Sequence, residues 1–218
     1  MNKPLALLAV AGTALLAACG SKTDANEKNF SAALTQYLEK KGELCLGARR
    51  WPVELQQMEL RMRDSIPAGP AGQMAALEGA GLVSGVDADV EGTGFNAGLK
   101  YKVRRYTLTD AAKPFMRERE VSSLGMNGRT MVKEANLCWG QKALNQIVKW
   151  EGPMKFGDYQ EVVVVYTYAL KDVAEWAKKP EIQSAFPHIK SHMDDAEKKQ
   201  ARHPLKLTSE GWEAKGLD

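Results

Sequence analysis

The chain has 218 residues, 44% of them hydrophobic, and its 30 lysines and arginines stand against 27 aspartates and glutamates, for a net charge of +3. This length allows one sizeable domain or two small ones that share a core. The near-balance of charge excludes a field strong enough to hold the whole protein on nucleic acid or on an acidic polymer.

An export signal is predicted over the first residues. Lys3 precedes an apolar run from Leu5 to Ala18, and small residues lead to Cys19. The run is too short to span a bilayer as a mature anchor, and its charged start and small end are those of a signal peptide. No later apolar stretch reaches spanning length, so we expect the rest of the chain to form a soluble body.

Residues 16–19, Leu-Ala-Ala-Cys, resemble the lipobox of bacterial lipoproteins. The resemblance implies that residues 1–18 are removed as a signal peptide and that Cys19 becomes the acylated first residue. By analogy with Gram-negative sorting, Gly20 in place of an aspartate favours the outer membrane, facing the periplasm. An ordinary cleaved signal with an incidental cysteine is the alternative.

Residues 19–28 are small and polar, which is typical of a flexible tether. A first amphipathic helix is predicted from Asn29, which can cap it, to Gly42, which can end it. The apolar residues of this helix recur at helical spacing; they are Phe30, Ala33, Leu34, Tyr37 and Leu38.

Two cysteines remain once Cys19 is assigned to the lipid. Cys45 stands in Leu-Cys-Leu-Gly and Cys138 in Leu-Cys-Trp-Gly. An even count in an oxidising compartment indicates a disulfide between them, with two separately buried thiols as the alternative. A catalytic cysteine is less favoured, because no histidine lies near either residue in the sequence.

The first half of the body, residues 29–125, is predicted to mix short strands and helices. Leu99, Tyr101 and Val103 alternate with basic residues, which predicts a strand with one buried face. A helix that ends in Leu-x-x-x-Gly-Leu-Val precedes this strand, and Tyr-x-Leu-Thr follows it. Together these pieces resemble the latter part of a winged helix.

The second half, residues 126–218, repeats fragments of the first. The Leu-Cys-x-Gly motif recurs after 93 residues and Leu-Thr recurs after 99. We therefore expect an α+β fold of two small winged-helix-like halves with short antiparallel sheets. An internal duplication explains the fragments, and chance similarity of turn motifs is the alternative.

A basic strand in the first half is a candidate for contact with an anionic partner. It carries Lys100, Lys102, Arg104 and Arg105. In a cytoplasmic protein such a strand beside a winged helix favours DNA, but an exported chain meets no promoter. The expected partner is instead an anionic component of the envelope, and an ordinary solvated strand face is the alternative.

Metal and cofactor sites are not predicted. His188, His192 and Asp195 share a helix face, but the glutamate that serves as general base in zinc peptidases is missing. The loop Gly92–Gly98 lacks the Lys-Ser/Thr of a phosphate-binding loop and is better explained as a hairpin tip.

The function expected from these patterns is binding or assembly at the cell envelope by a lipid-anchored protein. Catalysis is not favoured, because nucleophile motifs such as Gly-x-Ser-x-Gly are absent from the sequence. The alternative is an envelope hydrolase whose acid and base are carboxylates that the fold brings together. A nucleic-acid binder is the third class and requires the lipobox to be false.

Overall fold

The structure is a computed structural model that describes residues 21–217 apart from residues 93, 95, 96, 126 and 127. The predicted lipobox and Cys19 lie outside the described residues. Among the described residues, no helix has the length and apolar content needed to cross a membrane. The helices are α1 (Glu27–Lys41), α2 (Gln57–Arg61), α3 (Pro70–Gly79), η2 (Asp110–Phe115), η3 (Glu175–Lys178), α4 (Pro180–Ala185) and α5 (Pro187–Asp195). The strands are β1 (Glu43–Cys45), β2 (Val53–Gln56), β3 (Val83–Glu91), β4 (Lys100–Leu108), β5 (Met116–Gly125), β6 (Gly128–Phe156), β7 (Tyr159–Lys171), β8 (Ala201–Thr208) and β9 (Gly211–Ala214).

The larger sheet has the strand order β1-β6-β7-β8-β9, with β5 paired to β6, and all its pairs are antiparallel. Helix α1 packs on one face of this sheet, and the apolar stripe predicted for it is buried there. We call the resulting cluster the α1 core; it contains Phe30, Leu34, Leu38, Val162, Val164, Leu205 and Trp212.

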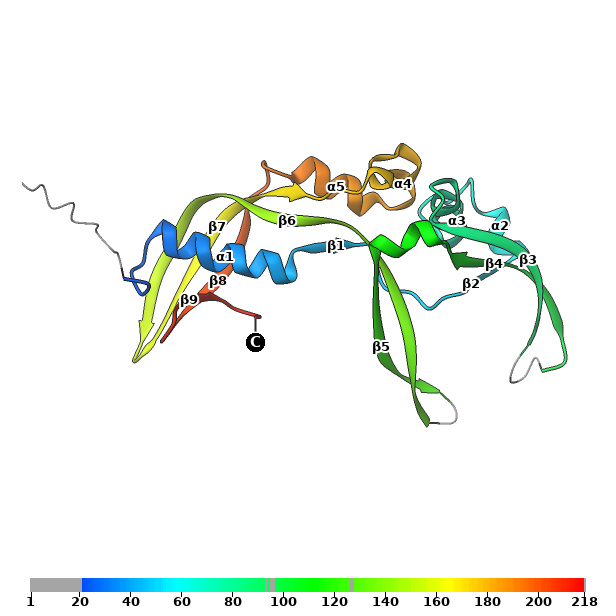
Figure 1. The fold of residues 1–218 in the computed structure, drawn as a ribbon, viewed down its shortest axis with the longest axis horizontal. Coiled ribbons are helices and arrows are strands. Elements are labelled where there is room, and N and C mark those ends of the chain that lie inside the picture. Colours follow the sequence, from blue (N-terminus) through cyan, green and yellow to red (C-terminus); the bar gives the residue numbers. More distant parts are fainter. Residues whose placement is uncertain (1–20, 93, 95–96, 126–127, 218) are drawn as a thin grey trace, which may run out of the picture.

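The smaller sheet has the order β2-β4-β3 and lies at the other end of the molecule from α1, beside α2 and α3 (Figure 1). Its buried side chains join those of α3, α4 and α5 in a second cluster, which we call the α3 core. This cluster includes Leu55, Met74, Leu77, Tyr106, Trp139, Ile182, Phe186 and Ile189.

Strand β6 connects the two cores. It is 29 residues long, and its side chains reach the α3 core through Trp139 and the α1 core through Leu144 and Ile147. The molecule is elongated, and β6 runs along it between the two lobes (Figure 1). A single continuous strand thus fixes how far the two ends of the protein stand apart.

Helix α1 begins earlier than predicted, and the tether is shorter. Asn26, not Asn29, is the N-cap, and its side chain accepts a hydrogen bond from the backbone N–H of Asn29. The side-chain amide of Asn29 instead donates to the carbonyl oxygens of Ser21 and Asp24, at 2.8 and 2.9 Å. Residues 21–24, expected to be part of a flexible tether, are therefore docked on the body.

The α+β class is confirmed, with antiparallel sheets, whereas two equivalent winged-helix-like halves are not confirmed. Both halves contain a strand, two helices and a hairpin in that order, but the strands pair differently. In the first half β2 pairs with β4, the last strand of its hairpin, whereas in the second half β7 pairs with β8, the first strand of its hairpin. The predicted boundary at residues 125 and 126 falls between the end of β5 and the start of β6.

Candidate functional site

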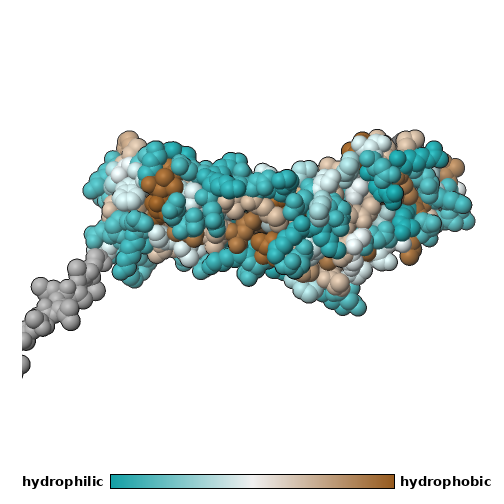
Figure 2. Space-filling view, turned by 90° about the horizontal axis from the view of Figure 1, so that it is seen from above, coloured by the Kyte–Doolittle hydropathy of each residue, from teal (hydrophilic) through white to brown (hydrophobic). Residues whose placement is uncertain are grey.

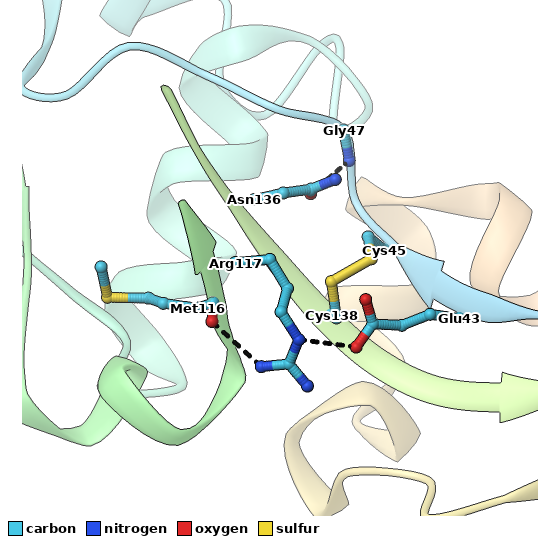
Figure 3. Close-up of a disulfide and its surroundings, with 7 residues drawn as sticks. All are labelled: Glu43, Cys45, Gly47, Met116, Arg117, Asn136 and Cys138. Atoms are coloured by element: carbon cyan, nitrogen blue, oxygen red, sulfur yellow. Dashed lines mark hydrogen bonds and ion pairs between the residues drawn. A yellow bond between two sulfur atoms is a disulfide. The ribbon is translucent and has the colours of Figure 1, made fainter. Parts of the chain in front are cut away.

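The predicted disulfide is present, and it lies where β1 pairs with β6. Cys45 and Cys138 are direct cross-strand partners, and their sulfur atoms are bonded. Close by, Nε of Arg117 donates to the Glu43 carboxylate at 2.7 Å, and the backbone N–H of Gly47 donates to the Asn136 side chain at 2.8 Å (Figure 3). These contacts hold the chain on both sides of β6 at the base of the β5–β6 hairpin.

The β5–β6 hairpin projects from the body beyond this base (Figure 1). Its register runs from Met116 opposite Leu137 to Gly125 opposite Gly128. Near the base the other edge of β6 is occupied, since Arg49 forms a bridge with Ala135. We call residues 119–125 and 128–134 the β5–β6 arm. Among the described residues, no third strand pairs with the arm. Both the edge of β5 that faces away from β6 and the edge of residues 128–134 that faces away from β5 are unpaired.

The two faces of the β5–β6 arm differ. On one face Glu134 is 17% exposed and pairs with Arg119 at 3.1 Å and with Arg50 at 3.8 Å. The other face is open, and it carries Leu124, which is 80% exposed, and Met131, which is 63% exposed. Because paired residues share a face, the pairing of Leu124 with Arg129 and of Ser122 with Met131 places the two apolar side chains near each other.

The β5–β6 arm therefore combines unpaired backbone edges with exposed apolar side chains. A two-stranded ribbon is marginally stable by itself, and a strand edge is a template for pairing with another chain. Charged residues along β5, from Arg117 to Glu120, oppose pairing with the wrong partner. The arrangement is suited to binding an extended segment of another protein.

The predicted basic strand is β4, and its charges meet acidic partners. Lys100, Lys102 and Arg104 lie directly opposite residues 91, 89 and 87 of β3, which are all acidic. Arg104 also pairs with Glu78 at 2.9 Å, and this hydrogen bond raises the pKa of Arg104. Arg105, on the other face of β4, pairs with Glu54 of β2 at 2.7 Å. The face is close to neutral, and an anionic partner for it stays a prediction.

The three side chains weighed as metal ligands have separate partners. His188 makes a hydrogen bond to the backbone of Cys45, and Asp195 pairs with Lys199 at 2.9 Å. His192 Nδ1 lies 3.3 Å from the Tyr168 hydroxyl, and burial lowers the pKa of this histidine. Among the described residues, the one set of three candidate ligands that converge includes both cysteines of the disulfide, whose sulfurs are already bonded to each other.

Several grooves among the described residues are lined by two carboxylates, by Asp87 and Asp89 in one and by Asp194 and Asp195 in another. A further such groove lies between α3 and α4. It has a volume of about 380 Å³, and Asp64 and Glu181 both line it. Asp64 is 86% exposed and pairs with Arg63 at 3.0 Å, so water reaches this carboxylate freely. Elsewhere, hydrogen bonds from Arg202 and Lys215 lower the pKa of Glu151 and of Glu161, which keeps both groups ionised at neutral pH.

The loop Gly92–Gly98 joins β3 to β4, as expected of a hairpin tip, although residues 93, 95 and 96 lie outside the described residues.

No family model, curated protein or solved structure matches the chain. Any function must therefore be argued from the surfaces described above.

Proposed function

We propose that this protein is a lipid-anchored module of the cell envelope that binds a partner protein through the β5–β6 arm. The observation that carries the proposal is the arm itself: among the described residues it has two unpaired edges, and on its open face Leu124 and Met131 are exposed among the charged residues Glu120, Arg129 and Lys133. A partner that supplies an extended, partly aliphatic segment satisfies both features, because it adds a strand to the edge of β5 and covers Leu124 and Met131. Catalysis has no part in this proposal.

The anchor is proposed to be the acylated Cys19, in the outer membrane and facing the periplasm. The docking of residues 21–24 on the body supports this arrangement, because it leaves only a short link between the anchor and the folded protein. The β5–β6 arm lies far from that end of the molecule (Figure 1). It is thus presented away from the lipid, where a partner can reach it.

A winged-helix-like unit is proposed for residues 53–108 alone. The order β2, α2, α3, β3, β4 and the sheet order β2-β4-β3 support it. In an exported protein this unit is a structural support, and the near-neutral face of β4 argues against a nucleic-acid surface.

Site-specific photo-crosslinking in cells tests the proposed binding surface. A photoreactive amino acid at Ser122, on the open face of the arm, is expected to give one discrete adduct. The same amino acid at Met58 of α2, which is 77% exposed, is the matched control and is expected to give none. Adding Leu124→Glu and Met131→Glu should weaken the adduct at least about tenfold, because buried apolar anchors each contribute 1 kcal/mol or more to an interface.

Equal crosslinking from the two positions, or an adduct that survives both substitutions, would contradict the proposed surface. The unfolding midpoint of the protein with Leu124→Glu and Met131→Glu should match that of the wild type, since both positions are exposed.

The anchor has its own test, which is the intact mass of protein extracted from membranes. A triacylated chain that begins at Cys19 supports the anchor, and an unmodified full-length chain contradicts it.

A further inference from the structure

The end of the molecule that holds residues 21–24 is formed by two neighbouring turns. Glu161 of β7 pairs with Lys206 of β8, so the strands continue side by side toward Tyr159 and Thr208. The turn between β6 and β7 therefore lies beside the turn between β8 and β9, at the end of the molecule where α1 begins (Figure 1). We call residues 154–161 the β6–β7 tip.

The β6–β7 tip is apolar and exposed. Phe156 is 82% exposed, Met154 57% and Tyr159 42%. Phe156 pairs directly with Tyr159, and Met154 pairs with Glu161 two residues further along, so these side chains share the face of the sheet opposite α1. The face of the molecule seen in Figure 2 is mostly hydrophilic, with separate apolar patches.

The tip contains two acidic residues: Asp158 is exposed in the turn itself, whereas Glu161, which shares the face of Phe156 and Tyr159, is already neutralised. The Tyr159 hydroxyl donates to the Glu161 carboxylate, and Lys215 forms an ion pair with the same carboxylate. Lys155, on the other face of β6, is exposed and can reach toward a polar layer. The tip thus combines aromatic and apolar side chains with a tyrosine hydroxyl and a lysine. Side chains of these kinds are typical of the interface between a bilayer and water.

Residues 22–24, which follow the predicted anchor in the sequence, contact the same end of the protein. The Trp212 indole N–H, next to the β8–β9 turn, donates to the carbonyl oxygens of Thr23 and Asp24, each at 3.1 Å. The carbonyl oxygen of Lys22 approaches Gly211 so closely that a β-carbon there would lie 3.0 Å away. Cys19 precedes Ser21 by two residues, which reach at most about 7 Å when extended.

We propose that the β6–β7 tip inserts Phe156, Met154 and Tyr159 into the headgroup region of the membrane that holds the acylated Cys19. The inference rests on the proposed lipid anchor. Because the link from the lipid to the docked residues 21–24 is so short, this end of the molecule has to face the bilayer. The tip thus gives the protein a second membrane contact, and it fixes the orientation of the long axis and of the β5–β6 arm.

Fluorescence quenching on the acylated, full-length protein tests this proposal. Phe156→Cys introduces one free thiol, since Cys45 and Cys138 are bonded to each other and Cys19 carries the lipid. Leu124→Cys on the β5–β6 arm is the matched control, because Leu124 is 80% exposed and Phe156 82%. Each variant is labelled with a small environment-sensitive fluorophore and reconstituted in vesicles of phosphatidylethanolamine and phosphatidylglycerol, with and without spin-labelled phospholipid.

The expected result is blue-shifted emission and severalfold stronger quenching at position 156 than at position 124. Vesicle flotation distinguishes failure of the proposed tip insertion from failure of the proposed lipid anchor. If the protein floats with the vesicles and the two labels are quenched equally weakly, the anchor stands and the tip does not insert. If the protein does not float, the anchor is wrong and the proposed orientation is wrong with it.

Discussion

Among single residues, Phe30 is the side chain on which the α1 end depends most. It is fully buried and meets Trp150 and Trp212 edge to face, with ring centroids 5.4 and 5.1 Å apart. Phe30→Ala should lower the free energy of unfolding by about 3–5 kcal/mol, since it removes a large buried ring and leaves a cavity. Denaturant titration measures this, with the exposed Phe156→Ala as control, expected to change stability by less than about 0.5 kcal/mol. Equal losses in the two variants would contradict this account of the α1 core.

Burial of the histidines predicts a loss of stability in mild acid. Desolvation lowers the pKa of His192 and of His203 in the folded protein. The unfolded chain takes up these protons near pH 6.5 whereas the folded protein does so only at lower pH, so acid favours unfolding. We expect the free energy of unfolding to fall as the pH drops from about 7.5 through 6.5 toward 5.5.

The variant His203→Gln separates this effect from other titrations. In the wild type, the His203 ring packs against the Tyr37 ring, with ring centroids 4.0 Å apart. The variant lacks this contact and therefore loses some stability at every pH. The difference between pH 7.5 and pH 5.5 should nevertheless be smaller than in the wild type, by at most about 1.4 kcal/mol for each pH unit. An unchanged difference would show that His203 does not contribute to the pH dependence.

Tryptophans show what the sequence can predict of individual burial. Large aromatic side chains favour core positions, and Trp139, Trp176 and Trp212 are at most 8% exposed. Trp150 contacts Phe30 edge to face and yet is 38% exposed. A sequence pattern can predict on which face of a strand such a residue lies. It does not predict how much of the side chain a packed helix or strand covers.

At the scale of elements, α1 was predictable because its apolar stripe has a single helical period and ends at a glycine. Strand β6 was missed over most of its length. From Gly128 to Lys133 every residue except the half-buried Val132 is exposed, so no apolar alternation marks this part of the strand. Further along, bulges interrupt the pairing between Leu144 and Met154, and each bulge shifts the alternation to the opposite face.

Strand β4 also shows why the anionic surface could not be judged from the sequence. Its basic residues were visible, but the register that places acidic β3 residues opposite them was not. We expect the wild-type protein to bind weakly to a heparin column. The triple variant Asp87→Asn, Asp89→Asn, Glu91→Gln should elute at distinctly higher salt, because Lys100 and Lys102 then lose the acidic residues opposite them, while Arg104 keeps Glu78 as its partner.

The matched control removes the same number of acidic charges elsewhere, through Asp158→Asn, Glu175→Gln and Glu210→Gln. This variant has the same net charge but keeps the acidic residues opposite Lys100 and Lys102, and it should elute close to the wild type. If both variants shift equally, total charge and not the β3–β4 register sets the affinity for anions.

For the whole molecule, the disulfide is the covalent link at the junction of the two cores. It closes a loop of 93 residues, so its removal should lower the free energy of unfolding by about 2–5 kcal/mol. The double variant Cys45→Ser, Cys138→Ser measures this by denaturant titration, and reductant should then have no further effect. A wild-type midpoint that reductant leaves unchanged would contradict a stabilising role.

The contact between Trp212 and residues 23 and 24 also sets an order of events. The two partners are 189 and 188 residues apart in the chain, so these two hydrogen bonds form only after almost the entire polypeptide has been synthesised, whereas the contacts of Asn29 with Ser21 and Asp24 are local. In the proposed lipoprotein, acylation of Cys19 can therefore precede the contact with Trp212. Completion of β9 then fixes residues 23 and 24 against the body.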